Sequence, residues 1–341
     1  LHIKAFLPST DNSLGSYLAL ISGLNHTSRF RQRDFPTSLP HVFNQLGYAT
    51  RLFVGDSATW QHIEDLASQQ RFSEFYAAGA IVTGGRLVKQ PRAHDPELFA
   101  FVRRQLRHGK PSINVIRTVS NHGPYEIDLE AEECVVPKLP DDLKAICNKD
   151  EQMVLTRLGY LKFSDKCLGR FVEQVEAEFP NSLFAITGDH YGREFLNNRP
   201  TEFEGTCVPL ILYGKQVLSG IDLPEGVAGS HLDITPTLAN LAAPRGFRFA
   251  SLGSDLLAPR WEFLGISETH AIGHDFIVAF RDTPHIELLP WTERDAPGYR
   301  QAAASLSRLS RVFEAFHGLS SWIGQQSEQV SLRNQGTASK R

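Results

Sequence analysis

The chain has 341 residues, of which 41% are hydrophobic and 21% charged, and its formal net charge is −3. This length allows one large α/β domain, or one domain with a small appendage. The slightly negative charge gives no electrostatic basis for binding nucleic acid, so we expect no such partner. The sequence contains no run of about 18 apolar residues that could cross a bilayer, and no signal peptide is visible.

Short apolar runs alternate with longer helical patterns over most of the chain. The runs that predict buried strands are Ala80–Thr83, Ser112–Val119, Leu183–Thr187 and Val208–Tyr213. Between them, Pro96–Arg107 and Met153–Glu178 carry apolar residues near helical spacing. This alternation predicts a three-layer α/β fold with a mostly parallel sheet, in which ligands bind at the carboxyl ends of the strands.

The pattern changes after about Leu257. Phe276–Phe280 and His285–Leu288 predict a hairpin, and Ser305–Ile323 predicts an amphipathic helix. From Gln325 onward the sequence is polar, and we expect disorder there. The predicted organisation has three parts, namely a core over residues 1–260, a small carboxyl-terminal element over 261–324 and a tail over 325–341.

The four cysteines show no CxxC spacing, which argues against a zinc finger or a thioredoxin-like site. Cys134 and Cys147 flank a polar, Pro-containing stretch and could form a disulfide outside the cytosol. Four free thiols are equally compatible with the sequence.

The most specific stretch is Ile-Thr-Gly-Asp-His-Tyr-Gly at 186–192, directly after a predicted strand. Asp189 and His190 offer one oxygen and one imidazole nitrogen to a divalent cation. Gly188 and Gly192 allow the backbone to turn tightly around such an ion. Taken alone, the pair is also compatible with a structural turn that contains a hydrogen-bonded histidine.

The sequence around this pair resembles the metal-binding motif of lipoteichoic acid synthases, which belong to the sulfatase-like branch of the alkaline phosphatase superfamily. Three further segments follow that family's order, namely Thr-Val-Ser-Asn-His-Gly-Pro-Tyr at 118–125, Ser-His-Leu-Asp-Ile-Thr-Pro-Thr-Leu at 230–238, and Ser-Leu-Pro at 38–40 followed by Leu-Gly-Tyr at 46–48. The resemblance covers roughly residues 5 to 260. It implies the alkaline-phosphatase-like fold and a divalent metal ion, which would be Mn, Mg or Zn.

A hydroxyl nucleophile is expected near the amino end of the chain. Asp11 or Asn12 can cap a helix there, which places Ser13 in the first turn, where free N–H groups favour an anion. The resemblance implies that Ser13 is the nucleophile and that it binds the metal together with Asp189 and His190. A purely structural capping role for Ser13 is the alternative.

Gly15 and Tyr17 bear on the reaction class. They stand where sulfatases carry the Pro or Ala and the Arg that mark a residue for conversion to formylglycine. We therefore expect no formylglycine at Ser13 and no hydrolysis of sulfate esters. An unmodified hydroxyl suits the phosphotransferase branch, although Thr is usual there.

The resemblance also assigns substrate contacts. Asn121 and His122 lie in the second motif, and His122 is expected to bind substrate and donate a proton to the leaving group. His231 stands where phosphoethanolamine transferases carry a histidine that contacts phosphate or a second metal. Trp60 follows Val-Gly-Asp, where the synthases have His-Gly-Asp before a Trp that lines the pocket, and Val54 in place of the His predicts different head-group recognition. Structural roles are the alternative for each histidine.

One part of the family's site has no counterpart in the sequence. The family's first strand ends in an acidic metal ligand, well before the nucleophile. Only twelve residues precede Ser13, and Asp11 is too close to substitute. We expect the missing strand and the family's membrane helices to lie upstream of Leu1; a degenerate site is the alternative.

Together, the motifs imply a transferase at the outer face of a membrane, held there by segments absent from this chain. It would move a phosphoglycerol or phosphoethanolamine group from a phospholipid donor to a glycan or glycolipid acceptor, through a phospho-serine. Two other functions stay open. One is phosphodiester or phosphomonoester hydrolysis at the same site, and the other is a binding domain that kept the fold without activity.

Overall fold

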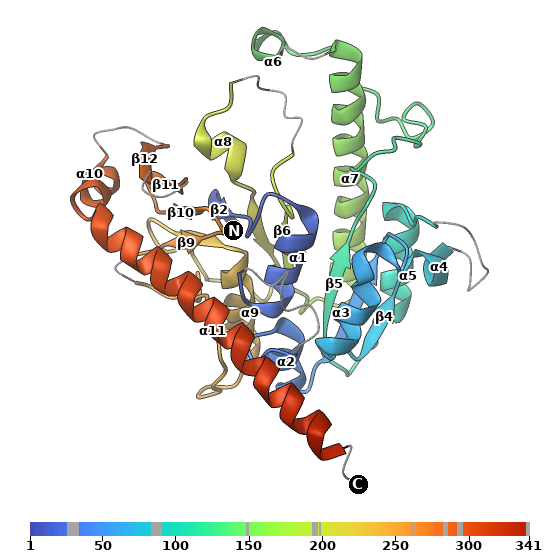
Figure 1. Ribbon diagram of the computed structural model, residues 1–341. Coiled ribbons are helices and arrows are strands. Elements are labelled where there is room, and N and C mark those ends of the chain that lie inside the picture. Colours follow the sequence, from blue (N-terminus) through green and yellow to red (C-terminus); the bar gives the residue numbers. More distant parts are fainter. Residues whose placement is uncertain are drawn as a thin grey trace.

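The computed structural model (Figure 1) describes residues 1–25, 34–82, 91–147, 150–192, 197, 199–260, 262–281, 286–291 and 296–338. One of its sheets is wholly parallel. Its strands, in spatial order, are β4 (Glu74–Tyr76), β3 (Ala49–Val54) and β5 (Ser112–Arg117). In this sheet Val54 lies opposite Arg117, so β3 and β5 end at the same edge.

A second group of strands lies beside the first (Figure 1). Its members are β1 (His2–Ile3), β7 (Leu210–Tyr213) and β6 (Phe184–Thr187) in one sheet, and β2 (Ala5–Leu7) with β8 (Ala228–Ser230) in another. The pair β2–β8 is parallel, whereas β7 runs antiparallel to both β1 and β6. The strands predicted around β5, β6 and β7 are confirmed, and the parallel pairs form the centre of an α/β fold.

Helices cover both faces of these strands. The main covering helices are α1 (Ser13–Ser22), α2 (Leu39–Gln45), α5 (Asp95–Gln105) and α7 (Glu151–Glu178). Adjacent residues of β5 point to opposite layers, as a strand requires. Val115 packs with residues of α1 and α2, and Ile116 packs with residues of α5 and α7. The predicted three-layer α/β fold is therefore confirmed, as are the helices expected at Pro96–Arg107 and Met153–Glu178.

The carboxyl-terminal part forms an antiparallel sheet covered by helices. Its strands, in spatial order, are β12 (Ile286–Pro290), β11 (Phe276–Phe280), β10 (His270–Ile272) and β9 (Gly265–Ile266), and the helices are α10 (Pro297–Ala304) and α11 (Leu306–Ala338). The predicted hairpin is confirmed as β11–β12. Phe280 of β11 stacks on Phe313 of α11 with ring centroids 3.7 Å apart. No described helix is long and apolar enough to cross a membrane.

Shorter elements connect these parts of the fold. They are η2 (Trp60–His62), α3 (Ile63–Gln69), α4 (Ala78–Val82), α6 (Asp141–Ile146), α8 (Glu202–Thr206), η3 (His231–Asp233) and α9 (Ile234–Ala242).

Two local expectations differ from the structure. The strand predicted at Ala80–Thr83 is wrong through Val82, because Ala80 and Ile81 donate their N–H groups to Ala77 O and begin the short helix α4; Thr83 lies outside the described residues. The tail expected to be disordered from Gln325 continues α11 to Ala338, since its sequence contains no proline to stop a helix already held by packing.

All four cysteines are free in the structure. Cys134 is buried in the core cluster beneath α7, and its Sγ lies 3.2 Å from Glu132 O, whereas Cys147 is half-buried after α6. The disulfide considered for this pair is therefore not formed.

The facing edges of β5 and β6 are open. Both strands pack under α7, through Ile116 and Phe184. Within the described ranges, however, no strand pairs with the second edge of either one. Every residue of β5 is half-buried, whereas every residue of its neighbour β3 is buried. The centre of the fold thus has backbone groups and apolar side chains that a further strand would cover.

A buried histidine joins strands that do not pair with each other. Ser9, just after β2, donates its N–H to Nδ1 of His231 (3.2 Å), and Nε2 of His231 donates to the carbonyl of Gly188, just after β6 (3.0 Å). Nδ1 therefore holds a lone pair and Nε2 holds the proton, so the ring is neutral. Burial lowers the pKa of His231 to about 4.

This link predicts that acid weakens the fold. The folded-state pKa of His231 lies below its usual value of 6.5, so its neutral form is favoured by folding, and its contribution to stability falls as the pH drops from about 6.5 to about 4. The loss should reach about 3 kcal/mol at most. Urea unfolding across this range should show a shallower pH dependence in His231→Gln than in the parent.

His108→Gln is the matched control, because His108 has a side chain that is 74% exposed. It should keep the pH dependence of the parent. A His231→Gln variant whose free energy of unfolding follows the parent's pH dependence would contradict the assigned link.

Candidate active site

Ser13 opens α1 at the carboxyl edge of the strands (Figure 1). Asn12 is the residue that caps the helix, because its side chain accepts from the N–H of Gly15 at 2.9 Å. Thr10 and Ser16 fix the segment that leads into the helix. Thr10 donates its N–H to the Ser16 hydroxyl, which donates in turn to the Thr10 carbonyl, and the two hydroxyls lie 3.2 Å apart. The capping function thus belongs to Asn12, which leaves the hydroxyl of Ser13 available for other contacts.

Ser13 and His190 meet across 177 positions of sequence. The Oγ of Ser13 lies 3.1 Å from Nε2 of His190. Nδ1 of the same ring donates to the carbonyl of Tyr191 at 2.6 Å, so Nε2 carries the lone pair and directs it toward Ser13. Asp189 accepts the backbone N–H of His190 through Oδ1 (3.0 Å), and its Oδ2 lies 3.8 Å from Nε2.

These three side chains fit a divalent cation. Donors bound to one tetrahedral ion at 2.0–2.2 Å lie roughly 3.3–3.6 Å apart, and the separations of 3.1 and 3.8 Å about Nε2 bracket that range. In the part of the chain that the structure describes, no three His, Cys, Asp or Glu side chains gather into a metal site. A cation held by Asp189 and His190 would therefore need the hydroxyl of Ser13 or a further ligand.

His231 lies directly beneath this cluster. Its bond to Gly188 O holds the turn that carries Asp189, and both of its ring nitrogens are engaged. Contact with phosphate or a second metal, as the resemblance implies, would require the ring to give up one of these bonds. In the structure, His231 instead positions the turn before Asp189 through its hydrogen bond to the carbonyl of Gly188.

Asn121 and His122 lie on the loop after β5 and are both exposed. Nδ1 of His122 donates to the carbonyl of Gly123 at 2.6 Å, so its Nε2 faces outward with a lone pair. Arg92 holds the loop through the carbonyls of Val119 (3.3 Å) and His122 (3.1 Å). Among the described residues, no hydrogen bond joins Asn121 or His122 to the Ser13 cluster.

Trp60 has a contact that the sequence analysis missed. The guanidinium of Arg117 lies over its ring, 3.9 Å from the centroid, and also pairs with Asp56. Arg117 is a charged residue near the end of the apolar run Ser112–Val119, and this exception to the run is the sequence feature that could have predicted a specific contact. Val54, which replaces the family's histidine, is buried in the core cluster that also contains Trp60.

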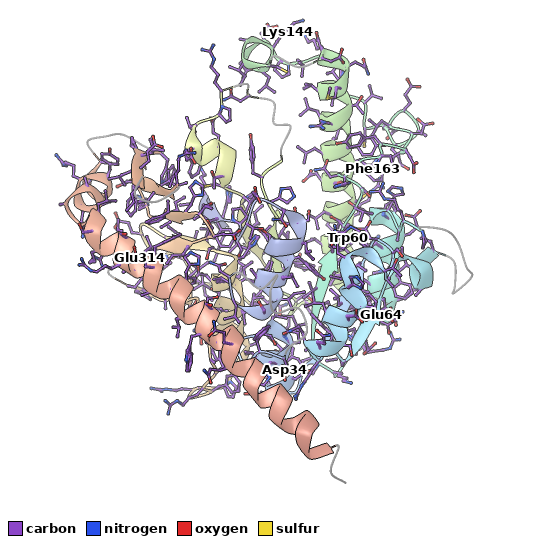
Figure 2. All side chains as sticks on the ribbon, viewed as in Figure 1. Asp34, Trp60, Glu64, Lys144, Phe163 and Glu314 are labelled. Carbon is purple, nitrogen blue, oxygen red and sulfur yellow. The ribbon has the colours of Figure 1, made fainter. Side chains whose placement is uncertain are left out.

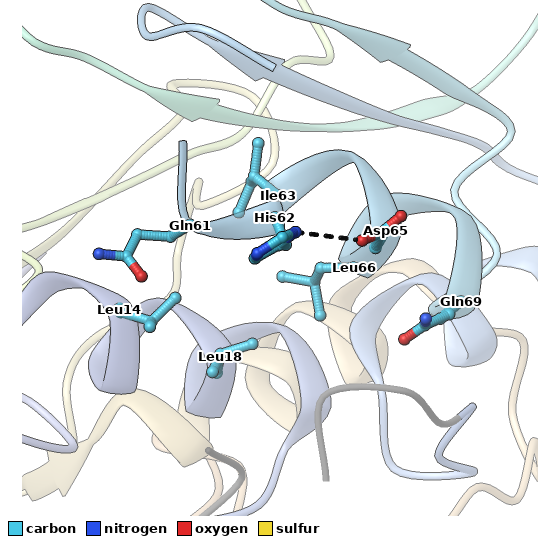
Figure 3. Close-up of a pocket in the computed structure, with 8 residues that line it drawn as sticks. All are labelled: Leu14, Leu18, Gln61, His62, Ile63, Asp65, Leu66 and Gln69. Carbon is cyan, nitrogen blue, oxygen red and sulfur yellow. Dashed lines mark ion pairs between the residues drawn. The ribbon is translucent and has the colours of Figure 1, made fainter. Parts of the chain in front are cut away.

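A pocket of about 280 Å³ lies between α1 and η2–α3 (Figure 3). The residues that line it are Leu14, Leu18, Gln61, His62, Ile63, Asp65, Leu66 and Gln69. It opens on the flank of α1 and does not include Ser13, Asp189 or His190. Ser13 lies instead at the amino end of that helix.

Several solved structures share this fold. The lipoteichoic acid synthase LtaP from Listeria monocytogenes matches with a TM-score of 0.70 at 16% identity, covering 96% of this chain and 83% of that one. The C-terminal periplasmic domain of EcEptC from Escherichia coli matches with a TM-score of 0.54 at 14% identity, covering 87% and 82%. The phosphonate monoester hydrolase of Agrobacterium radiobacter gives 0.56 at 13% identity, covering 92% and 88%.

A comparison with curated protein sequences gives no match. The family profile described as Sulfatase matches residues 6–244, which is more than half of the chain and contains Ser13, Asp189 and His190. This match shows that the chain belongs to the sulfatase family.

Proposed function

We propose that this chain is the catalytic domain of a metal-dependent transferase that moves a phosphoglycerol or phosphoethanolamine group. The donor is a phospholipid, and the acceptor is a hydroxyl of a glycan or glycolipid. The observation that carries the proposal is the contact of Ser13 Oγ with Nε2 of His190, beside the Asp189 carboxylate. A free hydroxyl at a helix amino end, next to cation ligands, suits attack on a phosphodiester.

The reaction has two steps. Ser13 Oγ, present as the alkoxide, forms a bond to phosphorus while the bond from phosphorus to the diacylglycerol oxygen breaks, which gives a phospho-serine. An acceptor hydroxyl then attacks phosphorus and releases Ser13. A divalent cation held by Ser13, Asp189 and His190 would lower the pKa of the serine hydroxyl and offset the charge on the phosphoryl oxygens.

His122 is the proposed proton carrier for both steps. Its Nδ1 proton is committed to Gly123 O, so it must hold a second proton on Nε2 to serve as an acid. From that nitrogen it would protonate the diacylglycerol oxygen in the first step and take the acceptor's proton in the second. The exposed loop allows His122 to reach a bound substrate without disturbing the core.

The location follows from the substrates. A donor in a lipid bilayer requires the domain to work at a membrane surface, and we place it on the outer face, held there by segments outside this chain. The similar fold of a domain described as periplasmic supports that assignment.

The role of Ser13 can be tested with two substitutions. Ser13→Ala should lower transfer by about 10³-fold or more, because the attacking oxygen is lost. Ser13→Thr should keep measurable activity, since it retains a hydroxyl. Both variants should unfold near the parent's temperature, because Asn12 rather than Ser13 caps α1. The measurement is release of diacylglycerol from phosphatidylglycerol and phosphatidylethanolamine, with and without a glycan acceptor.

Mass spectrometry of the trapped parent should find the added phosphoryl group on Ser13. If Ser13→Ala turns over like the parent, the nucleophile is another residue. If release is the same without a glycan acceptor and no transfer product forms, the enzyme is a hydrolase.

A second test concerns the chemical state of Ser13. With Gly15 and Tyr17 in the downstream positions, we expect an unmodified serine and negligible arylsulfatase activity. Tyr17 carries no guanidinium for a modifying enzyme to recognise. Its side chain is 6% exposed and packs among apolar side chains. Peptide mass spectrometry should give the mass of serine, and an aldehyde at Ser13 would redirect the assignment to sulfate esters.

The open edges of β5 and β6 support a proposal for the missing metal ligand. A strand between them, ending with an Asp or Glu at the carboxyl edge, would place its carboxylate beside Asp189 and Ser13. This chain should then bind Mn²⁺ more weakly than a longer chain that includes such an upstream strand, since one anionic ligand is absent. Calorimetric titration of Mn²⁺ into both chains measures the difference.

The matched control is the longer chain with that acidic residue changed to Asn or Gln. It should recover stability, because the strand edges are covered, without recovering the metal affinity. Equal Mn²⁺ affinity and equal turnover in all three chains would show that another residue of this chain completes the metal site.

A further inference from the structure

A groove of about 340 Å³ lies between the loop that follows β5 and the amino-terminal half of α7 (Figure 1). The loop lines it between Tyr125 and Val136, and the helix lines it between Gln152 and Tyr160. Figure 2 labels Phe163 on α7 and Lys144 on α6, and the helix residues of the groove lie between these two positions. We call this the α7 groove; it shares no lining residue with the pocket of Figure 3.

Two side chains hold the loop that joins His122 to the α7 groove. Arg92 donates to the carbonyl of His122 at 3.1 Å. The hydroxyl of Tyr160 donates to the carbonyl of Ile127 at 3.2 Å and accepts from the N–H of the same residue. Both side chains hold backbone groups, so the path of the loop is fixed. His122, the proposed proton carrier, and Tyr125, which lines the groove, are three residues apart on this path.

The α7 groove combines apolar surface with polar groups that have no partner. Tyr125 is 38% exposed, and its ring packs against Tyr160 with centroids 4.6 Å apart, while Val135 is 45% exposed. Among the described residues, no hydrogen bond or ion pair uses the carboxylate of Glu130 or the amide of Gln152. A sugar ring has apolar C–H faces and hydroxyl edges, so it matches both kinds of surface.

The charge around the α7 groove is negative. Within the part of the chain that the structure describes, the charged side chains that line it are Asp128 and Glu130. The loop over residues 125–136 contains five carboxylates and no Lys or Arg. Three cations of α7 lie near the loop, namely Arg157, Lys162 and Lys166. Five negative charges against three positive ones repel a ligand that carries phosphate or carboxylate groups.

We propose that the α7 groove binds an uncharged glycan and that this glycan is the acceptor. The inference rests on the proposed transferase function and names the class of its acceptor. The second step of that reaction requires an acceptor hydroxyl beside His122, and the groove begins on the same loop. A glycan seated on Tyr125 can extend along the loop toward His122.

The charge also decides which acceptors are excluded. A glycan hydroxyl donates to the carboxylates of Asp128 and Glu130 and accepts from the amide of Gln152, so its proton and its lone pairs are both used. A chain that already carries phosphodiester groups would bring negative charge against those carboxylates. The enzyme is therefore expected to modify a neutral glycan and to bind a phosphate-bearing polymer poorly. A basic, apolar peptide also matches the charge, but it does not account for the link to His122.

Binding of small oligosaccharides tests the proposal without turnover. The probes are cellotetraose, maltotetraose and chitotetraose, with tetragalacturonic acid as the anionic counterpart and a Lys-Leu repeat peptide as the competing class. Saturation-transfer NMR and calorimetry are performed with EDTA present, so that no metal ion holds the carboxylates. At least one neutral tetrasaccharide should bind about tenfold more tightly than tetragalacturonic acid. Binding of none of the neutral probes, or of the peptide alone, overturns the proposal.

Substitutions then locate the bound glycan. Tyr125→Ala should weaken binding of the neutral probe about fivefold or more, because the exposed ring is lost, whereas Tyr125→Phe should keep most of it. Gln152→Ala should weaken binding about threefold, since both amide contacts are removed. Glu130→Gln should reduce the discrimination against tetragalacturonic acid, because one negative charge is removed.

Two matched controls lie on α7 outside the groove. Leu161 is 54% exposed and Glu173 is exposed further along the helix, and neither lines the groove. Leu161→Ala and Glu173→Gln should change neither the affinity nor the discrimination. If Tyr125→Ala fails to fold, Gln152→Ala and Glu130→Gln still decide the matter, because their side chains are exposed and hold no other part of the chain. Unchanged binding in both of these folded variants overturns the proposal.

The binding data separate this inference from the proposed function. They are collected without a donor, so glycan binding that depends on Tyr125 can be observed even if no transfer is ever detected. Where transfer is observed, Tyr125→Ala should raise the KM for the glycan acceptor more than it lowers kcat. Transfer to a glycan with an unchanged acceptor KM would confirm the function and contradict the assigned groove.

Discussion

The neutral imidazole of His231 makes the contacts on which the arrangement of the candidate site depends. It joins Ser9, four residues before the proposed nucleophile, to Gly188, which directly precedes Asp189 and His190. The strands that carry these turns, β2 and β6, pair with other strands and not with each other. Because a protonated ring could not accept from the N–H of Ser9, the link requires the neutral form that burial enforces.

Helix α1 connects the two groups of strands. Ser13 in its first turn faces His190, and Tyr17 one turn later packs toward the strand that ends in Arg117. Leu20, further along the helix, contacts core clusters on both groups of strands. One helix thus fixes the position of the Ser13 hydroxyl relative to both groups of strands.

Within the described residues, β5 and β6 each pair with another strand along one edge only. β5 ends in Arg117, and β6 directly precedes the turn that carries Asp189. The half-buried residues of β5 mark an edge that a further strand could cover. A strand placed there would bury apolar surface and supply a charge at the same edge.

The sequence by itself determined what depends on neighbours along the chain. The apolar runs of β5, β6 and β7, the helical spacing of α5 and α7, the Asp-His turn after a strand and the serine at a helix start are all local patterns, and each was predicted where it lies. Only the tertiary structure decided which distant partners the side chains meet. It gave both nitrogens of His231 to backbone partners, covered Trp60 with Arg117, and made Ala78–Val82 a helix where a strand was expected. Those outcomes depend on contacts between residues far apart in sequence, and no local pattern records which distant group a side chain will meet.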